Sequence, residues 1–188
     1  VQKAINKEDL QTAVDYNAVA VQDYCSADEK IEVRVANDAN FLMNTIDHTH
    51  AFIIGQSGSG KSVFLHNIVG SIILKYAPED LQLYLLDFKL GGVEFNRYKG
   101  VKHVKAMLVD NSDQQITLEI LRDLKGQMEN RGKQLRDAGV SNIMEYNEAN
   151  QEKRMPHIMV VADECHELFR VGNDIPRAVS SEISEIVT

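Results

Sequence analysis

Cysteine is scarce in this sequence, and its scarcity excludes two classes of protein. Only Cys25 and Cys165 occur among the 188 residues. They are too few and too far apart for a disulfide framework or a cysteine-ligated metal cluster. The sequence therefore predicts a protein of a reducing, intracellular compartment.

The sequence also lacks long apolar runs and an excess of positive charge. No stretch of about 18 apolar residues is present to span a membrane, and Val1-Gln2-Lys3 does not begin a signal peptide. The formal net charge of -8 disfavours a uniformly basic nucleic-acid-binding surface but leaves room for a local basic loop. Because no methionine precedes Val1, we expect a soluble cytoplasmic domain cut from a longer protein, which a membrane anchor elsewhere could hold at the inner face of the cell membrane.

The composition that is present fits one globular domain. Apolar residues make up 44% of the chain and charged residues 26%, enough apolar content for a sizeable core. Residues 1–45 are weakly patterned, with a helix expected over 6–23 and a short strand over 31–35, and we treat them as an N-terminal flanking segment. Residues 46–188 form the predicted domain.

Strand and helix patterns alternate from residue 51 onward. Short apolar runs predict strands, and apolar residues at three- and four-residue steps predict helices. The expected strands are 51–54, 81–86, 104–109 and 157–162, and the expected helices are 62–75, 113–138 and 142–150. In helix 113–138 the apolar face is expected to comprise Ile116, Ile120, Leu121, Leu124, Met128 and Leu135. Such alternation predicts an α/β fold with a mostly parallel sheet covered by helices on both faces.

A glycine-rich loop separates the first expected strand from the first helix. Residues 55–62 match the pattern G-x-x-x-x-G-K-(S/T), in which small residues let backbone N–H groups curl around phosphates. Lys61 would reach the β- and γ-phosphates, and the Ser62 hydroxyl would bind Mg²⁺. The strand before and the helix after favour this P-loop over a Gly/Ser linker. We expect ATP and Mg²⁺ as cofactors, with nucleotide contacts from Gly55, Gln56, Ser57, Gly58, Ser59, Gly60, Lys61, Ser62 and Val63.

An acid pair ends the last apolar strand. In a parallel sheet the carboxyl ends of the strands line the ligand crevice, so Asp163 would lie beside the P-loop and hold Mg²⁺ through water. Glu164 would polarise the water that attacks the γ-phosphate. The alternative is a solvated helix N-terminus. The guanine-recognition pattern N/T-K-x-D is absent, which favours ATP over GTP.

Three further segments leave alternatives open. Asp87-Phe88-Lys89, at the end of the second strand, is either functional or a structural ion pair. Cys165 and His166 are read as the first turn of a helix, with Leu168 and Phe169 entering the core, rather than as a metal site. A basic stretch is read as a solvated loop or a nucleic-acid contact, and it comprises Arg97, Lys99, Lys102, His103 and Lys105.

Together these segments resemble the FtsK/SpoIIIE motor domain over residues 48–170. The resemblance rests on four strand-end motifs and on a mid-helix arginine followed by a G-V-x-N-I turn and Y-N. These are His50 to Gly55, Gly58 to Ser62, Leu85 to Lys89, Val160 to Glu164, Arg131, Gly139 to Ile143, and Tyr146-Asn147. It implies a RecA-like P-loop NTPase, a homo-hexameric ring that pumps double-stranded DNA, and catalytic roles for Lys61 and Glu164. It also implies that the C-terminal part of the core, with a γ-phosphate-sensing residue and an arginine finger, lies beyond Thr188.

The cargo stays open at this point. DNA pumps of this family commonly read D-P-K, whereas this chain has Asp87-Phe88-Lys89 followed by Leu90-Gly91-Gly92, closer to the type VII secretion branch, which moves protein substrates. Asp163 to His166 also spell the D-E-x-H box of helicases, but the other motifs do not fit that class. A domain that binds ATP only as a structural element is disfavoured by the intact lysine, serine and acid pair. DNA translocation is the preferred reading.

Overall fold

The computed structural model describes residues 24–28, 30–36, 39–43, 49–89, 91–109 and 114–169. The helix expected over residues 6–23 lies outside these ranges. Among the described helices, none combines the length and the hydropathy needed to cross a lipid bilayer.

A parallel three-stranded sheet forms the centre of the structure, as the alternation of elements predicts. Its strands are β3 (Leu81–Asp87), β4 (Val104–Leu108) and β5 (His157–Asp163), in the order β4-β3-β5. The register pairs Leu81 with His157 and Asp87 with Asp163, so β3 and β5 end side by side. The carboxyl ends of the strands therefore meet at one edge of the sheet.

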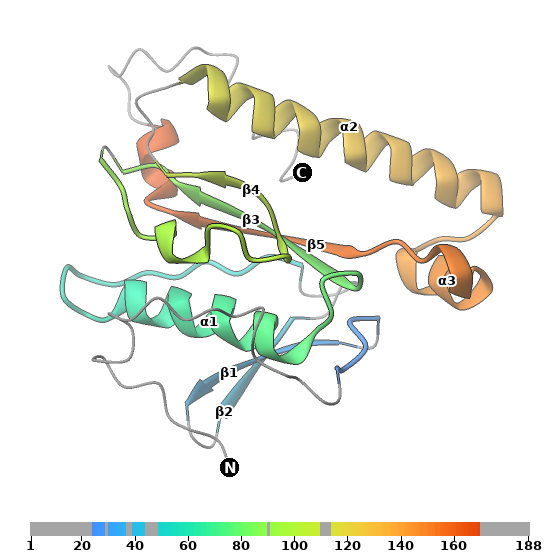
Figure 1. Ribbon diagram of the computed structural model, residues 1–188, viewed down its shortest axis with the longest axis horizontal. Coiled ribbons are helices and arrows are strands. Elements are labelled where there is room, and N and C mark those ends of the chain that lie inside the picture. Colours follow the sequence, from blue (N-terminus) through green and yellow to red (C-terminus); the bar gives the residue numbers. More distant parts are fainter. Residues whose placement is uncertain are drawn as a thin grey trace.

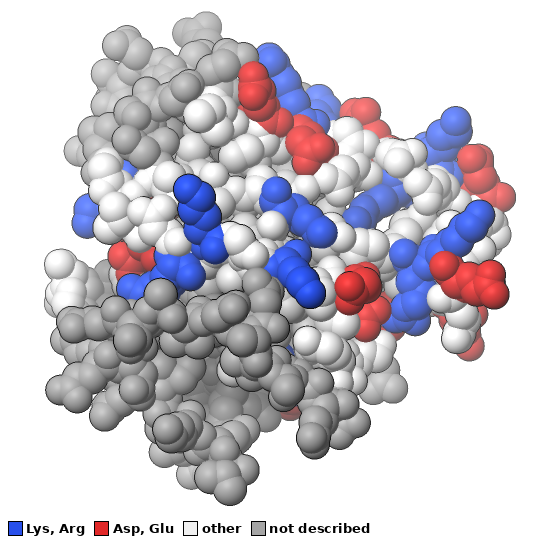
Figure 2. All heavy atoms as spheres, in the orientation of Figure 1, with Lys and Arg blue, Asp and Glu red and all other residues white. Residues whose placement is uncertain are grey.

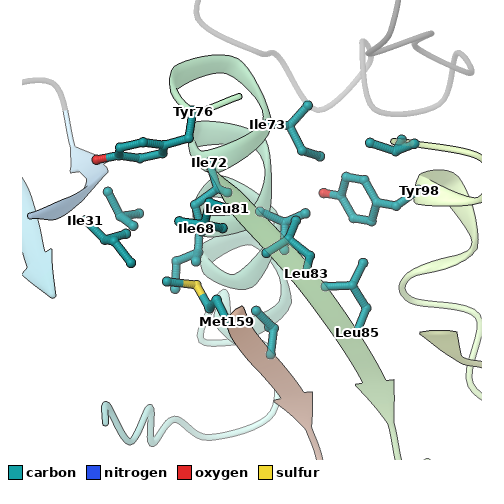
Figure 3. Packing of buried hydrophobic residues seen from close by; sticks show 14 of the residues in the cluster. Ile31, Ile68, Ile72, Ile73, Tyr76, Leu81, Leu83, Leu85, Tyr98 and Met159 are labelled. Carbon is teal, nitrogen blue, oxygen red and sulfur yellow. The ribbon is translucent and has the colours of Figure 1, made fainter. Parts of the chain in front are cut away.

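Helices cover both faces of this sheet (Figure 1), with α1 (Lys61–Lys75) on one face and α2 (Gln114–Ala138) on the other. Beneath α1, Ile68 and Ile72 pack with Leu83 in the larger core cluster (Figure 3). Beneath α2, a smaller cluster joins Leu118 and Leu121 to strand residues. Both faces of β3 are thus buried, which is the arrangement that a continuous apolar strand requires, whereas Val160 of β5 is 41% exposed.

A two-stranded hairpin packs against the outer side of α1. Its strands are β1 (Ile31–Ala36) and β2 (Ala39–Met43), which pair antiparallel. Tyr76, directly after α1, accepts a hydrogen bond from the Glu32 N–H at 2.7 Å and donates one to the Lys30 carbonyl at 3.2 Å. The helix carrying the glycine-rich loop is therefore held between the sheet and the hairpin, which explains why it is apolar on more than one side.

The expected apolar face of α2 is wrong at two positions. Ile116 and Met128 are 46% and 47% exposed, whereas Leu118, Leu121 and Leu124 are buried. Ile116 lies about 140° around the helix from Leu121 at 100° per residue. Met128 lies on the buried side, but a helix of 25 residues extends about 37 Å, and α2 reaches well past the short strands (Figure 1).

The strand expected over residues 51–54 is also not found. The structure assigns no strand there, and the sheet of the described residues contains only β3, β4 and β5. Ile53 packs against the core below α1, while Phe52 and Ile54 are 76% and 83% exposed. An apolar run indicates burial, but a strand also needs a hydrogen-bonded neighbour, and the sequence pattern does not show whether one lies alongside.

Candidate functional site

The glycine-rich loop enters α1 through left-handed backbone. Gly58 and Gly60 have φ angles of 81° and 92°, and Gly60 is the N-cap residue of the helix. L-residues with a β-carbon rarely adopt such angles, so glycine is required at both positions. The Ser59 N–H donates to the Gln56 carbonyl at 3.0 Å and closes the turn. The loop thus has the backbone form that the sequence pattern predicts.

The N-terminus of α1 is suited to an anion. The first backbone N–H groups of a helix have no partner inside the helix, and the helix dipole places positive charge there. No side chain caps this end by a hydrogen bond, and the first turn carries no acidic residue. A phosphate group would supply both the charge and the acceptor oxygens that this end favours.

Lys61 is the first residue of α1 and contacts both members of the acid pair. Its Nζ donates a hydrogen bond to Glu164 Oε1 at 2.8 Å and lies 3.2 Å from Asp163 Oδ1. The hydrogen bond with Glu164 raises the pKa of Lys61 and, in return, lowers the pKa of Glu164. The site therefore holds an ammonium and an ionised carboxylate at neutral pH.

Glu164 stands on an unusual backbone. Among the described residues it is the one non-glycine with a positive φ, at 52°. Its N–H donates to Asp163 Oδ1 at 2.9 Å, and the chain then enters the short 3-10 helix η4 (Cys165–Phe169). Left-handed non-glycine residues cost about 1–3 kcal/mol and cluster at functional sites. The helical turn expected at Cys165 and His166 is present, although as a 3-10 helix.

His166 is a contact of the acid pair that the sequence reading missed. Its Nδ1 lies 3.1 Å from Glu164 Oε2, and its Nε2 lies 3.3 Å from Glu167 Oε1. The ring is 64% exposed. Nothing in the spacing of His166 and Glu164, only two residues apart, signals this contact, because it depends on the left-handed turn at Glu164.

A cavity of about 1250 Å³ joins these parts. It is lined by the glycine-rich loop, the start of α1, the end of β5 and Lys89. Of the nine expected nucleotide-contact residues, all except Ser59 line it. Ser62 and Asp163 are among the lining residues, and hydroxyl and carboxylate oxygens of this kind are what Mg²⁺ prefers. The residues present therefore fit a nucleoside triphosphate with Mg²⁺.

Asp87 is the last residue of β3, and its carboxylate is buried and binds the protein backbone. The residue is 1% exposed, and its carboxylate accepts hydrogen bonds from the N–H groups of Lys89 at 3.0 Å and Glu94 at 3.3 Å. Burial raises the pKa of Asp87 despite these two hydrogen bonds. Asp87 thus has a structural role, because it binds the backbone that follows it. Whether Lys89 of the same motif has a functional role is a separate question.

The motif residues between α2 and β5 lie at the opposite edge of the sheet, where β5 begins and α3 (Ile143–Ala149) is found (Figure 1). Arg131 donates a hydrogen bond to the Pro156 carbonyl at 2.6 Å. Asn142 caps α3 by accepting the Glu145 N–H at 2.9 Å. Arg131 therefore holds the residue before β5 and Asn142 fixes the start of α3, and neither residue is among those that line the cavity.

Asn147 is the centre of this second polar cluster. It is 1% exposed, accepts the Met155 N–H at 2.6 Å and donates to the Met155 carbonyl at 3.0 Å. It also donates to Asp28 Oδ1 at 2.9 Å, as does His157 Nε2. Arg154 lies 2.7 Å from the other oxygen of Asp28. The sequence reading assigned Tyr146-Asn147 only to a family pattern and missed this anchoring role.

The residues of the basic stretch differ in exposure, because His103 is buried and the other four are exposed. Its four cations are exposed, and Figure 2 shows several Lys and Arg side chains near the middle of this face, where Figure 1 places the segment from η2 (Asn96–Tyr98) to β4. Acidic side chains are interspersed around them. His103 is different, because it is 4% exposed and its Nε2 donates to the Tyr76 carbonyl at 2.8 Å. The surface cations are therefore Arg97, Lys99, Lys102 and Lys105.

Comparison with known proteins places these features in a family. The family model described as the FtsK/SpoIIIE family matches residues 3–182. The DNA translocase FtsK of Listeria monocytogenes is 31% identical over 166 residues, which are 81% of this chain and 21% of that protein. The ESX-5 secretion system protein EccC5 of Mycobacterium tuberculosis is 34% identical over 142 residues, 71% of this chain and 10% of that protein. The chain spans about a fifth or less of these relatives.

Solved structures show the same fold. The cytoplasmic domain of the type VII secretion ATPase EccC of Thermomonospora curvata superposes with a TM-score of 0.70 at 24% identity, over 92% of this chain and 21% of that one. The pCW3 conjugation coupling protein TcpA, in a monomer form with ATPγS, superposes with a TM-score of 0.64 at 28% identity, over 85% of this chain and 43% of that one. The predicted RecA-like P-loop fold is confirmed.

Proposed function

The chain belongs to the FtsK/SpoIIIE family, and from that premise we propose that it is the ATP-binding and ATP-hydrolysing part of a translocating motor. The observation that carries this proposal is the contact of Lys61 with Asp163 and Glu164. Through this contact one cavity contains a lysine suited to phosphate binding, a carboxylate suited to Mg²⁺ binding (Asp163) and a carboxylate suited to general-base catalysis (Glu164). This combination is what phosphoryl transfer to water requires.

Binding falls to the loop and the start of α1. Backbone N–H groups of residues 55–63 would bind the phosphates, and Lys61 would contact the β- and γ-phosphates. A phosphate competes with Asp163 and Glu164 for the Lys61 ammonium, so nucleotide binding releases the acid pair. Ser62 and Asp163 would hold Mg²⁺, which supplies positive charge to the phosphate oxygens.

Hydrolysis falls to Glu164. The hydrogen bond from Lys61 lowers the pKa of Glu164, and a glutamate released from that bond is still ionised at neutral pH, so the carboxylate is able to polarise a water molecule. Glu164 lines the cavity and contacts Lys61, so its carboxylate lies where the terminal phosphate is expected. Lys61 and Glu164 are therefore the proposed catalytic residues.

We propose double-stranded DNA as the cargo and a homo-hexamer as the working assembly. The exposed cations Arg97, Lys99, Lys102 and Lys105 offer contacts to phosphate groups. The similarity to a protein named DNA translocase FtsK supports this reading. The motor would work in the cytoplasm, and a membrane anchor elsewhere in the protein would hold it at the inner face of the cell membrane.

A protein substrate is the second candidate, and one sequence observation favours it. Asp87-Phe88-Lys89 is followed by Leu90-Gly91-Gly92, as in the secretion branch of the family. The similarities to EccC5 and to the EccC ATPase agree with this alternative. The two candidates differ in cargo, not in the chemistry of the cavity.

The experiment measures ATP hydrolysis by the full-length protein with and without double-stranded DNA. A DNA motor is expected to be stimulated, and the stimulation should fall steeply with salt because phosphate contacts release counterions. A Lys99→Glu/Lys105→Glu variant should weaken DNA stimulation while basal hydrolysis is retained. Indifference to DNA together with stimulation by a secreted substrate peptide would transfer the assignment to protein secretion. Light scattering tests the hexamer.

A further inference from the structure

Lys89 follows a strand end that is tied to the acid pair. The Phe88 N–H donates to the Asp163 carbonyl at 3.2 Å, so the ladder between β3 and β5 continues one residue past Asp87. Phe88 is 2% exposed and packs below α2. The next residue, Lys89, therefore leaves the sheet at its carboxyl edge, next to the turn at Glu164.

The backbone at Lys89 is fixed by the residues around it. Asp87 accepts the Lys89 N–H at 3.0 Å and the Glu94 N–H at 3.3 Å, which closes the segment between them over one buried carboxylate. Gly92 lies so close that a β-carbon there would be 2.2 Å from Asp87 Oδ2. This close approach requires glycine. Together with the hydrogen bonds to Asp87, it holds the backbone at Lys89 in one position.

The ammonium of Lys89 is a second cation at the cavity. Among its described lining residues, Lys61 and Lys89 are the only Lys or Arg. Lys61 is shared between Asp163 and Glu164, whereas no described carboxylate forms an ion pair with Lys89 within 4.0 Å. Lys89 is exposed, and its charge contributes to the lowered pKa of Glu164.

Lys61 is shared between two carboxylates, those of Asp163 and Glu164. Apart from Lys89, the cavity therefore has little positive charge available for a triphosphate. The start of α1 and Lys61 belong to the glycine-rich loop and serve the phosphates bound in that loop. Lys89 approaches from β3, on the side of the acid pair. On the side of the cavity where Glu164 lies, Lys89 would be nearest to the terminal phosphate, because Glu164 acts on the water that attacks this phosphate.

We propose that Lys89 is a second phosphate-binding lysine, which contacts the terminal phosphate of the bound nucleoside triphosphate. This inference rests on the proposed function of the cavity and adds to it a residue that distinguishes a triphosphate from a diphosphate. Asp87 and Gly92 act as positioning residues for it.

The test compares the affinities of this chain for Mg-ATPγS and Mg-ADP by titration calorimetry. Lys89→Ala is expected to weaken ATPγS binding about tenfold or more, the scale of a charge-assisted hydrogen bond, and to change ADP binding less than about threefold. Lys89→Arg should retain most of the ATPγS affinity. The matched control is Lys133→Ala, which removes an exposed lysine on α2 and should change neither affinity.

Two results would overturn the proposal. Unchanged ATPγS affinity in Lys89→Ala means that the lysine does not contact the nucleotide. Equal losses for ATPγS and ADP mean that the effect is structural or concerns the other phosphates. Failure of the parent chain to bind either nucleotide is a different result, because it rejects the proposed function of the cavity and this inference with it.

Discussion

Lys61 and Glu164 lie 103 positions apart in the sequence, yet Lys61 Nζ donates a hydrogen bond to Glu164 Oε1 at 2.8 Å. The contact follows from the topology. The acid pair ends β5 at the carboxyl edge of the sheet, and α1, which begins at Lys61, packs on one face of the sheet with its start toward that edge. Figure 1 shows the start of α1 and the end of β5 at the same end of the molecule.

Lys61→Ala is expected to abolish Mg-ATP binding. The substitution removes the phosphate-binding ammonium and leaves Asp163 and Glu164 without their shared cation, so the cavity becomes strongly anionic. We expect affinity to fall at least about 100-fold, or about 2.7 kcal/mol, in titration calorimetry. Lys99→Ala, which removes an exposed lysine, is the matched control. Equal affinity of Lys61→Ala and the parent would reject the P-loop assignment.

Glu164→Gln is expected to separate binding from hydrolysis. Glutamine has nearly the same shape and keeps one oxygen acceptor for Lys61, but it is neutral and does not act as a base. Hydrolysis by the full-length protein should slow by about 10²–10⁴, while the Mg-ATP affinity stays within a few-fold of the parent. Unchanged turnover would place the catalytic role on another residue.

The sequence predicts well what depends on short motifs and on strand ends. Residues 55–62 specify the loop before a helix, and Asp163-Glu164 ends an apolar strand, so the pattern predicts both at the carboxyl edge of a parallel sheet. They meet there even though residues 51–54 form no strand. The hydrogen bond between Lys61 and Glu164 shows that the loop and the acid pair lie side by side, as expected. The roles of these residues in nucleotide binding remain predictions.

Features that depend on partners outside the local pattern were not predictable. Residues 51–54 have a strand's composition, but the pattern is silent on a neighbouring strand. His103 reads as part of a basic stretch, yet its ring turns inward to the Tyr76 carbonyl. Met128 carries the helical period beyond the end of the sheet. In each case the outcome depends on whether a segment far away in the sequence lies alongside, which the local pattern does not show.

Gly92 and Gly126 should respond with opposite sign to the same substitution. A β-carbon at Gly92 meets the Asp87 carboxylate, whereas at Gly126, in α2, nothing lies within 4 Å. Gly92→Ala is expected to destabilise the fold by about 1–3 kcal/mol. Gly126→Ala should stabilise it by about 0.5–1 kcal/mol, because alanine favours helix over glycine. Urea unfolding measures both, and a neutral Gly92→Ala would show that the loop beside Asp87 is loosely held.

Stability should fall as the pH drops below about 6.5, the ordinary pKa of histidine. Burial lowers the pKa of His66, of His103 and of His157 in the fold. Between the lowered and the ordinary pKa, the unfolded chain binds more protons than the folded chain, so the free energy of unfolding decreases with decreasing pH.

Urea unfolding at pH 7.5, 6.5 and 5.5 measures this dependence. His103→Gln removes one titrating group, keeps a donor for the Tyr76 carbonyl, and should flatten the pH dependence. His50→Gln, at an exposed position, is the matched control and should leave it unchanged. Stability that stays level from pH 7.5 to 5.5 would contradict the burial argument.

Asn147→Ala is expected to destabilise the fold without weakening nucleotide binding. The side chain is 1% exposed and satisfies both polar groups of the Met155 backbone as well as Asp28. Alanine leaves the N–H and carbonyl of Met155 without this partner, while Asp28 keeps His157 and Arg154. Buried unsatisfied groups cost about 1–3 kcal/mol each, so we expect a total loss of about 2–4 kcal/mol.

The pKa of Asp28 is part of the same argument. Burial by itself would raise this pKa, but the hydrogen bonds from Asn147 and His157 and the charge of Arg154 outweigh it and lower the pKa. Removing Asn147 takes away one of these stabilising contacts, so the pKa of Asp28 should rise, which carbon-detected NMR titration of the carboxyl group measures.

The matched control is Asn67→Ala, which removes an exposed asparagine from α1 and should be neutral or slightly stabilising because alanine favours the helix. Both variants should bind Mg-ATPγS like the parent where they are folded, since the Asn147 cluster lies where β5 begins and the cavity where it ends. A large loss of nucleotide affinity in Asn147→Ala with unchanged stability would move this part of the family pattern from an anchoring role to the site itself.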